Sequence, residues 1–113
     1  MTEPTVLLEE RGAVAVLTLN RPQALNSLTR QMHQEVWAAL DRVDANPTLR
    51  ALVLTGAGRG FCAGADLSEF DFSEGPNQIE RADPGPVIDQ CFNPTTRRLQ
   101  KYRVPIIAAV NGV

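Results

Sequence analysis

Few residues in this sequence are suited to a disulfide, a metal centre or a reactive nucleophile. The 113 residues include two cysteines and one histidine, which is neither a disulfide framework nor a zinc-binding pattern. Cys62 lies in a glycine-rich loop, whereas His33 belongs to a different predicted element, so the thiol lacks a base to activate it. We therefore expect Cys62 to be a small buried thiol, His33 to be a surface residue and the chain to bind no metal.

Strong net charge and long apolar runs are also missing. The formal net charge of −2 gives no electrostatic basis for binding nucleic acid or an anionic membrane. No apolar stretch approaches the roughly 20 residues that span a bilayer, and residues 1–12 carry three glutamates and no signal-peptide core. We expect one cytoplasmic domain with a modest core and with neither nucleic acid nor a membrane as partner.

The chain is organised around a predicted strand, loop and helix start between residues 50 and 70. Ala51 to Thr55 is a short apolar run typical of a buried strand. Residues 56–64 hold four glycines, and Asp66 followed by Glu69 forms a predicted capping box. Such a sequence places backbone N–H groups at the positive end of a helix, an arrangement that binds anions.

Two common nucleotide-binding loops fit this stretch poorly. A P-loop is excluded because no Gly-Lys-Ser/Thr ends the loop. Residues 58–63 fit the G-x-G-x-x-G/A pattern of dinucleotide-binding domains. However, Gly64 and the predicted cap Asp66 still follow, so the helix would begin too late. A dinucleotide-binding domain stays open as an alternative.

The segments before this stretch predict a hairpin and a helix. Residues 5–10 and 13–19 are strand-like and joined by Arg11-Gly12, which can form a two-residue turn. Residues 20–26 are a connecting loop. Residues 29–46 predict a helix, capped by Thr29, Ser27 or Asn26 and ended by Asn46-Pro47. Its apolar stripe consists of Leu28, Met32, Val36, Ala39, Leu40 and Val43.

The segments after residue 70 are less regular. Residues 71–86 contain three prolines and two glycines, which is typical of a loop. Residues 87–92 look helical, and Asn93-Pro94 then predicts either a kink or the start of a new helix. Residues 105–110 are a further short strand. A basic cluster of Arg97, Arg98, Lys101 and Arg103 precedes it, where we favour complementing the helix C-terminal dipole over binding nucleotide phosphates.

Three stretches resemble the crotonase superfamily, the enoyl-CoA hydratase/isomerase family, and they occur in the family's order. They are LNRPQALN at residues 19–26, GFCAGADL at residues 60–67 and PIIAAVNGV at residues 105–113. The resemblance implies an α/β chain, the N-terminal part of a crotonase-type ββα superhelix. It also implies that residues 1–113 are one partial domain, truncated before the family's second oxyanion-hole glycine and acid/base residues. We therefore expect the chain alone to be inactive.

The resemblance also implies a reaction and a site. The family stabilises a thioester enolate between two backbone N–H groups, and the Ala65 N–H stands at the first of these. Asp66 is expected to act as a cap rather than as a base. Gln23 occupies a position where the family often has a lysine, so it can form a hydrogen bond but not an ion pair with a phosphate. The implied substrate contacts are Gln23, Ala24, Leu25, Ala63, Gly64, Ala65, Asp66 and Leu67.

Further expectations follow from the same resemblance. Coenzyme A is part of the substrate, so no separate cofactor is expected, and a complete chain is expected to form a homotrimer or hexamer. Residues 71–86 are either a lid over an acyl pocket or a surface excursion without a binding role. The spacing of Asn93-Pro94, Arg97-Arg98 and Leu99 resembles the branch that isomerises ring-epoxidised phenylacetyl-CoA. A plain enoyl-CoA hydratase and a non-catalytic acyl-CoA-binding or scaffold protein are the alternatives.

Overall fold

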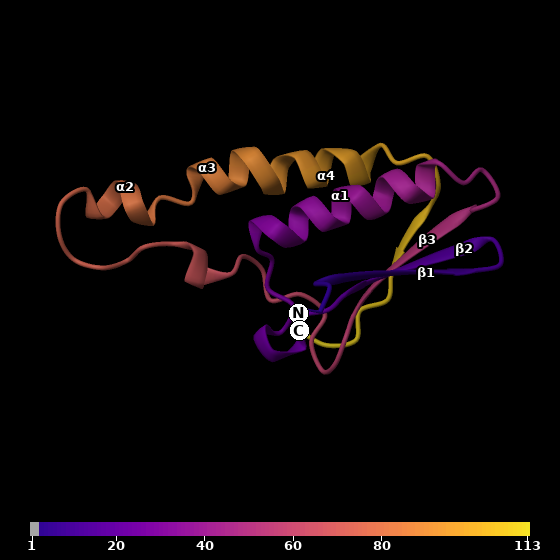
Figure 1. Cartoon of the computed structure of the whole chain (residues 1–113), viewed down its shortest axis with the longest axis horizontal. Helices are drawn as coiled ribbons and strands as arrows, with labels where there is room; N and C mark the ends of the chain where they lie inside the picture. The colour runs from indigo at the N-terminus through magenta and orange to yellow at the C-terminus, as the bar shows by residue number, and fades with distance from the viewer. Residues whose placement is uncertain (1–2) are drawn as a thin grey trace.

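A computed structural model describes residues 3–113 and shows a four-stranded sheet with helices along one face (Figure 1). The strands β1 (Val6–Arg11), β2 (Val14–Leu19), β3 (Ala51–Gly56) and β4 (Ile106–Ala108) lie in chain order. β1 and β2 are antiparallel, whereas the β2–β3 and β3–β4 pairs are parallel. The predicted α/β class is confirmed, and the first three strands with their intervening helix form a ββα unit.

The hairpin forms as the alternating pattern predicts. β2 alternates half-buried and buried side chains along its length, as expected for a strand with one face on a core. Ala15, Leu17 and Leu19 face that core together with Leu52 of β3. Gly12 turns the chain at a φ of 61°, a conformation that glycine adopts without strain.

Helix α1 (Arg30–Asp44) covers the sheet and confirms the predicted helix. Its N-cap is Thr29, whose hydroxyl accepts a 3.1 Å hydrogen bond from the Met32 N–H. The predicted apolar stripe from Met32 to Val43 is buried against the sheet. Burial of that stripe rather than helix propensity holds the helix in place.

His33 corrects the prediction of a surface histidine, because only 1% of it is exposed. Its ring packs edge-on against Phe92 at 4.4 Å between centroids, and its Nδ1 lies 2.8 Å from the Thr95 hydroxyl. Trp37 donates to the same hydroxyl at 2.7 Å. A second helix therefore packs against α1 in addition to the sheet. Together they bury a wider face of α1 than its apolar stripe indicates.

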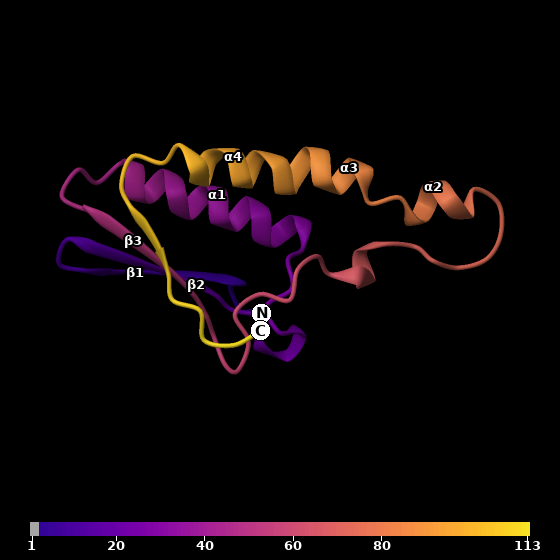
Figure 2. The ribbon, with the colours of Figure 1, turned by 180° about the vertical axis from the view of Figure 1, so that it is seen from behind.

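That second helical layer runs along α1 in both ribbon views (Figures 1 and 2). It consists of α3 (Gly85–Val87), the π-helical turn η3 (Ile88–Phe92) and α4 (Asn93–Gln100), with helical backbone at each junction. Pro94 lacks an N–H and its ring would clash with a carbonyl in an ordinary α-helix. The wider π turn just before it accommodates the proline. The predicted interruption is thus a π turn within one continuing helical run.

The segment between the loop and this layer projects beyond the sheet (Figures 1 and 2). The molecule consequently measures 53 Å along its longest axis and 28 and 27 Å along the others. The segment includes the 3₁₀ turn η2 (Leu67–Glu69) and a short helix α2 (Gln78–Ala82), which the predicted loop at 71–86 did not include. Arg81 closes it by donating to the Asp71 carboxylate at 2.6 Å.

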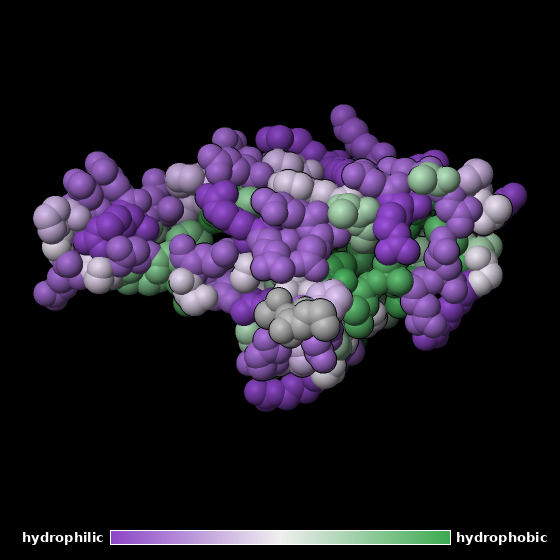
Figure 3. Space-filling model, in the orientation of Figure 1, coloured by the Kyte–Doolittle hydropathy of each residue, from purple (hydrophilic) through white to green (hydrophobic). Residues whose placement is uncertain are grey.

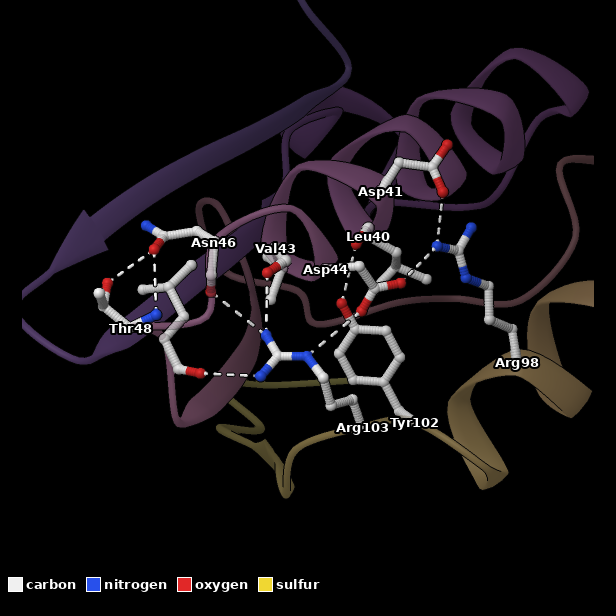
Figure 4. A network of polar contacts seen from close by, with 10 residues as sticks. Leu40, Asp41, Val43, Asp44, Asn46, Thr48, Arg98, Tyr102 and Arg103 are labelled. Carbon is white, nitrogen blue, oxygen red and sulfur yellow. Dashed lines mark hydrogen bonds and ion pairs between the residues drawn. The ribbon is translucent and has the colours of Figure 1, made fainter.

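Two members of the basic cluster, Arg98 and Arg103, bind the end of α1 rather than the end of their own helix (Figure 4). Arg98 pairs with Asp41 at 2.6 Å and with Asp44 at 3.0 Å, and Arg103 donates to the Val43 carbonyl at 3.0 Å. Positive charge at a helix C-terminus is favourable. Because β3 and β4 are parallel, the chain enters β4 at the opposite end of the strands from the glycine-rich loop that follows β3.

The surface is mostly hydrophilic, but a hydrophobic patch lies over β4 and the adjoining chain (Figure 3). Ile107 is 50% exposed and Val110 is 65% exposed. β4 is also the last strand of the sheet order. Across residues 3–113, no helix combines the length and apolar character needed to cross a membrane.

Candidate functional site

The glycine-rich loop after β3 folds against residues 20–28, and a buried asparagine holds the two together. The Asn26 amide nitrogen donates to the Ala57 carbonyl at 3.0 Å and to the Gly60 carbonyl at 2.8 Å. Its amide oxygen accepts from the Arg21 backbone N–H at 2.7 Å. Asn26 is fully buried with a φ of 57°, a left-handed conformation that asparagine tolerates. Among the three predicted helix caps, Thr29 serves that role and Asn26 does not.

A second asparagine, in the chain after β4, holds the same loop. The Asn111 amide nitrogen donates to the carbonyls of Gly58 at 3.0 Å and Gly60 at 3.1 Å, and its oxygen accepts from the Gly56 N–H at 3.2 Å. Gly56 is required here, because a Cβ would collide with the Gly60 carbonyl and lie 2.6 Å from the Phe61 carbonyl. The loop therefore joins β3 and the chain after β4.

Sequence reasoning assigned a loop-holding role to neither asparagine. Asn26 lies in the first of the three motifs and Asn111 in the third, and both bind carbonyl groups at 57–60, around the start of the second. One sequence feature could have indicated this role: each asparagine lies in a loop and caps no helix. An amide side chain in that position is free to bind backbone carbonyls. The three motifs thus form one hydrogen-bonded unit.

Ala65 lies in this unit in an extended, strand-like bridge with Leu28. The Leu28 N–H donates to the Gly64 carbonyl at 2.7 Å, and the Asp66 N–H donates to the Leu28 carbonyl at 3.0 Å. Successive N–H groups of an extended chain point in opposite directions, so the Ala65 N–H points away from Leu28. No hydrogen bond among the described residues gives this N–H an acceptor.

The structure brings the other predicted substrate contacts to the same place. Gln23 and Ala24 belong to the 3₁₀ turn η1 (Pro22–Ala24), and Leu25 follows it with a φ of 52°. The Ala63 N–H donates to the Leu25 carbonyl at 3.0 Å, which ties the two loops directly. Gln23 is exposed, and Leu67 is 67% exposed.

Asp66 differs from these residues because its side chain is already engaged. Only 8% of the residue is exposed. One carboxylate oxygen accepts from the Ser68 N–H at 2.8 Å and from its hydroxyl at 2.6 Å, and the other lies 2.7 Å from the Arg21 guanidinium. The Ser68 hydrogen bonds, reinforced by Arg21, lower the pKa of Asp66 to about 2. An ionised, fully bonded carboxylate of this kind is suited to structure and not to proton transfer at neutral pH.

The predicted capping box forms only in part. Asp66 caps η2, but η2 is a three-residue 3₁₀ turn and not an α-helix. The Glu69 carboxylate accepts from the Arg30 N–H at 2.8 Å instead of returning to the Asp66 N–H. The expected helix N-terminus is therefore absent after this loop. The alternative of a dinucleotide-binding domain is wrong for the same reason, since that fold places a helix directly after the loop.

Behind the loop lies a small apolar cavity of about 110 Å³ between the sheet and the helices. Cys62 is half-buried and lines it together with Phe61, Leu28 and His33. Burial lowers the pKa of His33, so its imidazole is neutral. No hydrogen bond links it to Cys62 within the described residues. In that same part of the chain, no group of three or more His, Cys, Asp or Glu side chains is placed to hold a metal ion.

The chain is similar to proteins of one known family. Residues 9–113 match the family model of enoyl-CoA hydratase/isomerase. The chain is 47% identical over 105 residues to 1,2-epoxyphenylacetyl-CoA isomerase from Escherichia coli, an alignment covering 92% of this chain and 38% of that protein. It is 41% identical over 108 residues to short-chain-enoyl-CoA hydratase from Clostridium acetobutylicum, covering 95% of this chain and 39% of that protein.

The fold is similar to those of solved enoyl-CoA hydratases. An enoyl-CoA hydratase from Bacillus anthracis superposes with a TM-score of 0.77 and 29% identity, covering 96% of this chain and 40% of that one. An enoyl-CoA hydratase/isomerase from Mycobacterium paratuberculosis gives a TM-score of 0.74 at 33% identity, covering 96% and 42%. The chain thus spans about two fifths of the length of the relatives it matches. With its family model matched over nearly the whole sequence, the chain belongs to the enoyl-CoA hydratase/isomerase family.

Proposed function

We propose that this chain supplies one half of an oxyanion hole in an enzyme that processes acyl-CoA thioesters. The observation that carries the proposal is the Ala65 N–H, which has no acceptor among the described residues although the backbone on both sides of it is bonded to Leu28. A donor fixed in advance and left free is what stabilises charge that develops on an oxygen. The relatives named above share a CoA thioester in their names.

In this mechanism the Ala65 N–H donates to the thioester carbonyl oxygen. As the α-carbon loses a proton, or as a nucleophile adds to the β-carbon, negative charge moves onto that oxygen and the hydrogen bond strengthens. Loss of one such donor costs on the order of 10²–10³ in rate. The second donor and the proton-transfer groups would come from other parts of a complete enzyme, because Asp66 is fully bonded and Glu69 accepts from the Arg30 N–H.

Substrate contact would involve the loop that packs beside this donor. Gln23 is exposed beside Ala24 and Leu25, where its amide can hydrogen-bond to the coenzyme A portion without forming an ion pair. Coenzyme A arrives as part of the substrate, so the proposal requires no separate cofactor. We further propose a homotrimer or hexamer in the cytoplasm for the complete enzyme.

Between isomerase and hydratase chemistry we favour the ring-epoxide isomerase branch. The 47% identity to 1,2-epoxyphenylacetyl-CoA isomerase supports it, together with Pro94, Arg97 and Arg98 in the second helical layer. Comparing turnover of ring-epoxidised phenylacetyl-CoA with hydration of crotonyl-CoA by the complete enzyme tests this choice. Hydration without isomerisation would refute it.

Calorimetric titration with acetoacetyl-CoA, NAD and ATP tests the general proposal. We expect binding of the CoA thioester, with heat from neither NAD nor ATP. Desulfo-coenzyme A separates recognition of the nucleotide from recognition of the thioester carbonyl. Binding of NAD with no binding of acetoacetyl-CoA would overturn the proposed function.

A further inference from the structure

The Arg21 side chain connects the two loops of the site, and the mechanism above gives it no role. Its guanidinium lies 2.7 Å from the Asp66 carboxylate and donates to the Ser27 carbonyl at 2.7 Å. The two side chains of the pair are only 19% and 10% exposed. Charge-assisted hydrogen bonds with so little exposure are short and strong.

The position of this pair in the chain gives it a specific consequence. Arg21 lies two residues before Gln23, in the loop that carries the proposed substrate contacts, and Asp66 directly follows Ala65. The backbone also joins the loops here, through the Leu28 hydrogen bonds to Gly64 and Asp66. The residues on either side of Ala65 are therefore fixed to residues 20–28, which include the proposed substrate contacts. Backbone hydrogen bonds to Leu28 hold Gly64 and Asp66, and the ion pair with Arg21 holds the Asp66 side chain.

We propose that Arg21 is a positioning residue that, through Asp66, holds the Ala65 N–H in register with the substrate loop at Gln23–Leu25. This inference rests on the proposed function of the site. Binding at one loop then orients the donor on the other, because the ion pair makes the two loops move as one unit. Orientation of this kind matters because a displacement of about 1 Å can reduce a rate by about 10².

A purely structural role makes different predictions. A residue that only stabilises the fold would loosen the sheet and the loops together when removed. A positioning residue changes the environment of the Ala65 N–H while the β1–β2 hairpin stays as it was. The matched control is Arg11, which also pairs with a carboxylate, Glu9, at 3.0 Å, but on the exposed surface of the hairpin.

The first experiment uses NMR on the ligand-free parent chain, Arg21→Gln, Arg21→Lys and Arg11→Gln. In Arg21→Gln we expect the Ala65 amide shift to move and the Asp66 carboxyl to titrate at higher pH. The Leu28 and Asp66 amides should exchange about tenfold faster, since a hydrogen bond to a charged group contributes that much to a local equilibrium. Arg21→Lys should restore part of each change, and Arg11→Gln should cause none.

Two results would overturn the inference. One is an Arg21→Gln protein whose Ala65 shift and Leu28 and Asp66 exchange match the parent. The other is a protein in which amides of the β1–β2 hairpin exchange faster by the same factor, which shows only a general loss of stability.

The second experiment adds acetoacetyl-CoA to the same four proteins. In the parent and in Arg11→Gln we expect shifts of both the Gln23 and the Ala65 amides. In Arg21→Gln we expect the Gln23 shift to persist and the Ala65 shift to disappear. A parental Ala65 response in Arg21→Gln would refute positioning. A parent without any response would refute the proposed function, while the ligand-free experiment still decides whether Arg21 positions the Ala65 N–H.

Discussion

Replacing the buried Asn26 with aspartate tests how the loops are held together. Asn26→Asp keeps the shape of the side chain and tolerates the left-handed backbone, but it removes the two N–H donors. The amide nitrogen currently donates to the Ala57 and Gly60 carbonyls. A carboxylate there would place negative charge against two carbonyl oxygens in a fully buried site, so we expect the new side chain to be protonated in the folded state.

The magnitude follows from two costs. A neutral carboxylic acid offers one O–H donor for two carbonyls. The Gly60 carbonyl still accepts from Asn111, so the Ala57 carbonyl and imperfect geometry cost about 1–3 kcal/mol at any pH. Keeping the acid protonated at pH 7 costs about 4 kcal/mol more, because an unfolded aspartate titrates near pH 4 and each pH unit contributes about 1.4 kcal/mol.

The sign of the pH dependence is therefore fixed. The folded pKa of the new acid lies above its unfolded value, so the penalty is smallest below about pH 4 and grows as pH rises. Urea denaturation of the variant and the parent between pH 4 and pH 7.5 measures the difference directly. If Asn26→Asp is too unstable to show a cooperative unfolding transition at pH 7, we expect the transition to reappear near pH 4, which supports the same conclusion.

The control is Asn20→Asp, because the Asn20 amide donates to the Pro4 carbonyl at 3.0 Å in an exposed position. Water can replace that hydrogen bond, so a change below about 1 kcal/mol with little pH dependence is expected. A pH-independent deficit in Asn26→Asp, or one no larger than that of Asn20→Asp, would show that the buried amide does not hold the loops as described.

Three further predictions concern single groups of the site. Asp66, whose pKa is lowered to about 2, should contribute stability that is complete above about pH 4 and lost as pH falls towards 2; Asp66→Asn should flatten that part of a pH-dependent melt. Burial lowers the pKa of His33, so parental stability should decline as pH falls below about 6.5, and a decline that persists in His33→Gln would refute this. Ala65→Pro should abolish turnover in a complete enzyme while Ala65→Gly is far milder; near-parental kcat in a proline variant with a parental melt would remove Ala65 from the mechanism.

The local hydrophobic pattern was sufficient to predict the elements that bury only one face. The alternation in residues 13–19 and the stripe from Met32 to Val43 both predict a face against a core, and both faces are buried. Periodicity could not place His33, because its burial depends on Phe92 and Thr95, which come about 60 residues later in the chain. Likewise, Asn93-Pro94 reads as an interruption locally, whereas the π turn lets the helical layer continue over α1.

The three motifs could be found in the sequence, but the contacts that hold them together could not be predicted from it. A glycine-rich loop before Asp66 and Glu69 indicates a helix N-terminus, and the structure has a three-residue turn there instead. The cause is competition for partners. The Glu69 carboxylate binds the Arg30 N–H, and the Asp66 N–H binds the Leu28 carbonyl, so neither completes the local box. Such competition is set by contacts across more than 35 residues and leaves no local signature.

The oxyanion donor that we propose at Ala65 needs rigidity that a glycine-rich loop does not provide by itself. Flexible residues lose most conformational entropy when they are fixed, so the loop must be held by its neighbours. Here the Asn26 and Asn111 amides fix the carbonyls at its start, and the Leu28 bridge fixes the backbone at its end. The extended backbone at Ala65 then leaves its own N–H outside that bridge. It follows that variants weakening these ties should reduce the stability of the loop and the alignment of the donor together, whereas a variant of the distant Arg98 or Arg103 should affect stability alone.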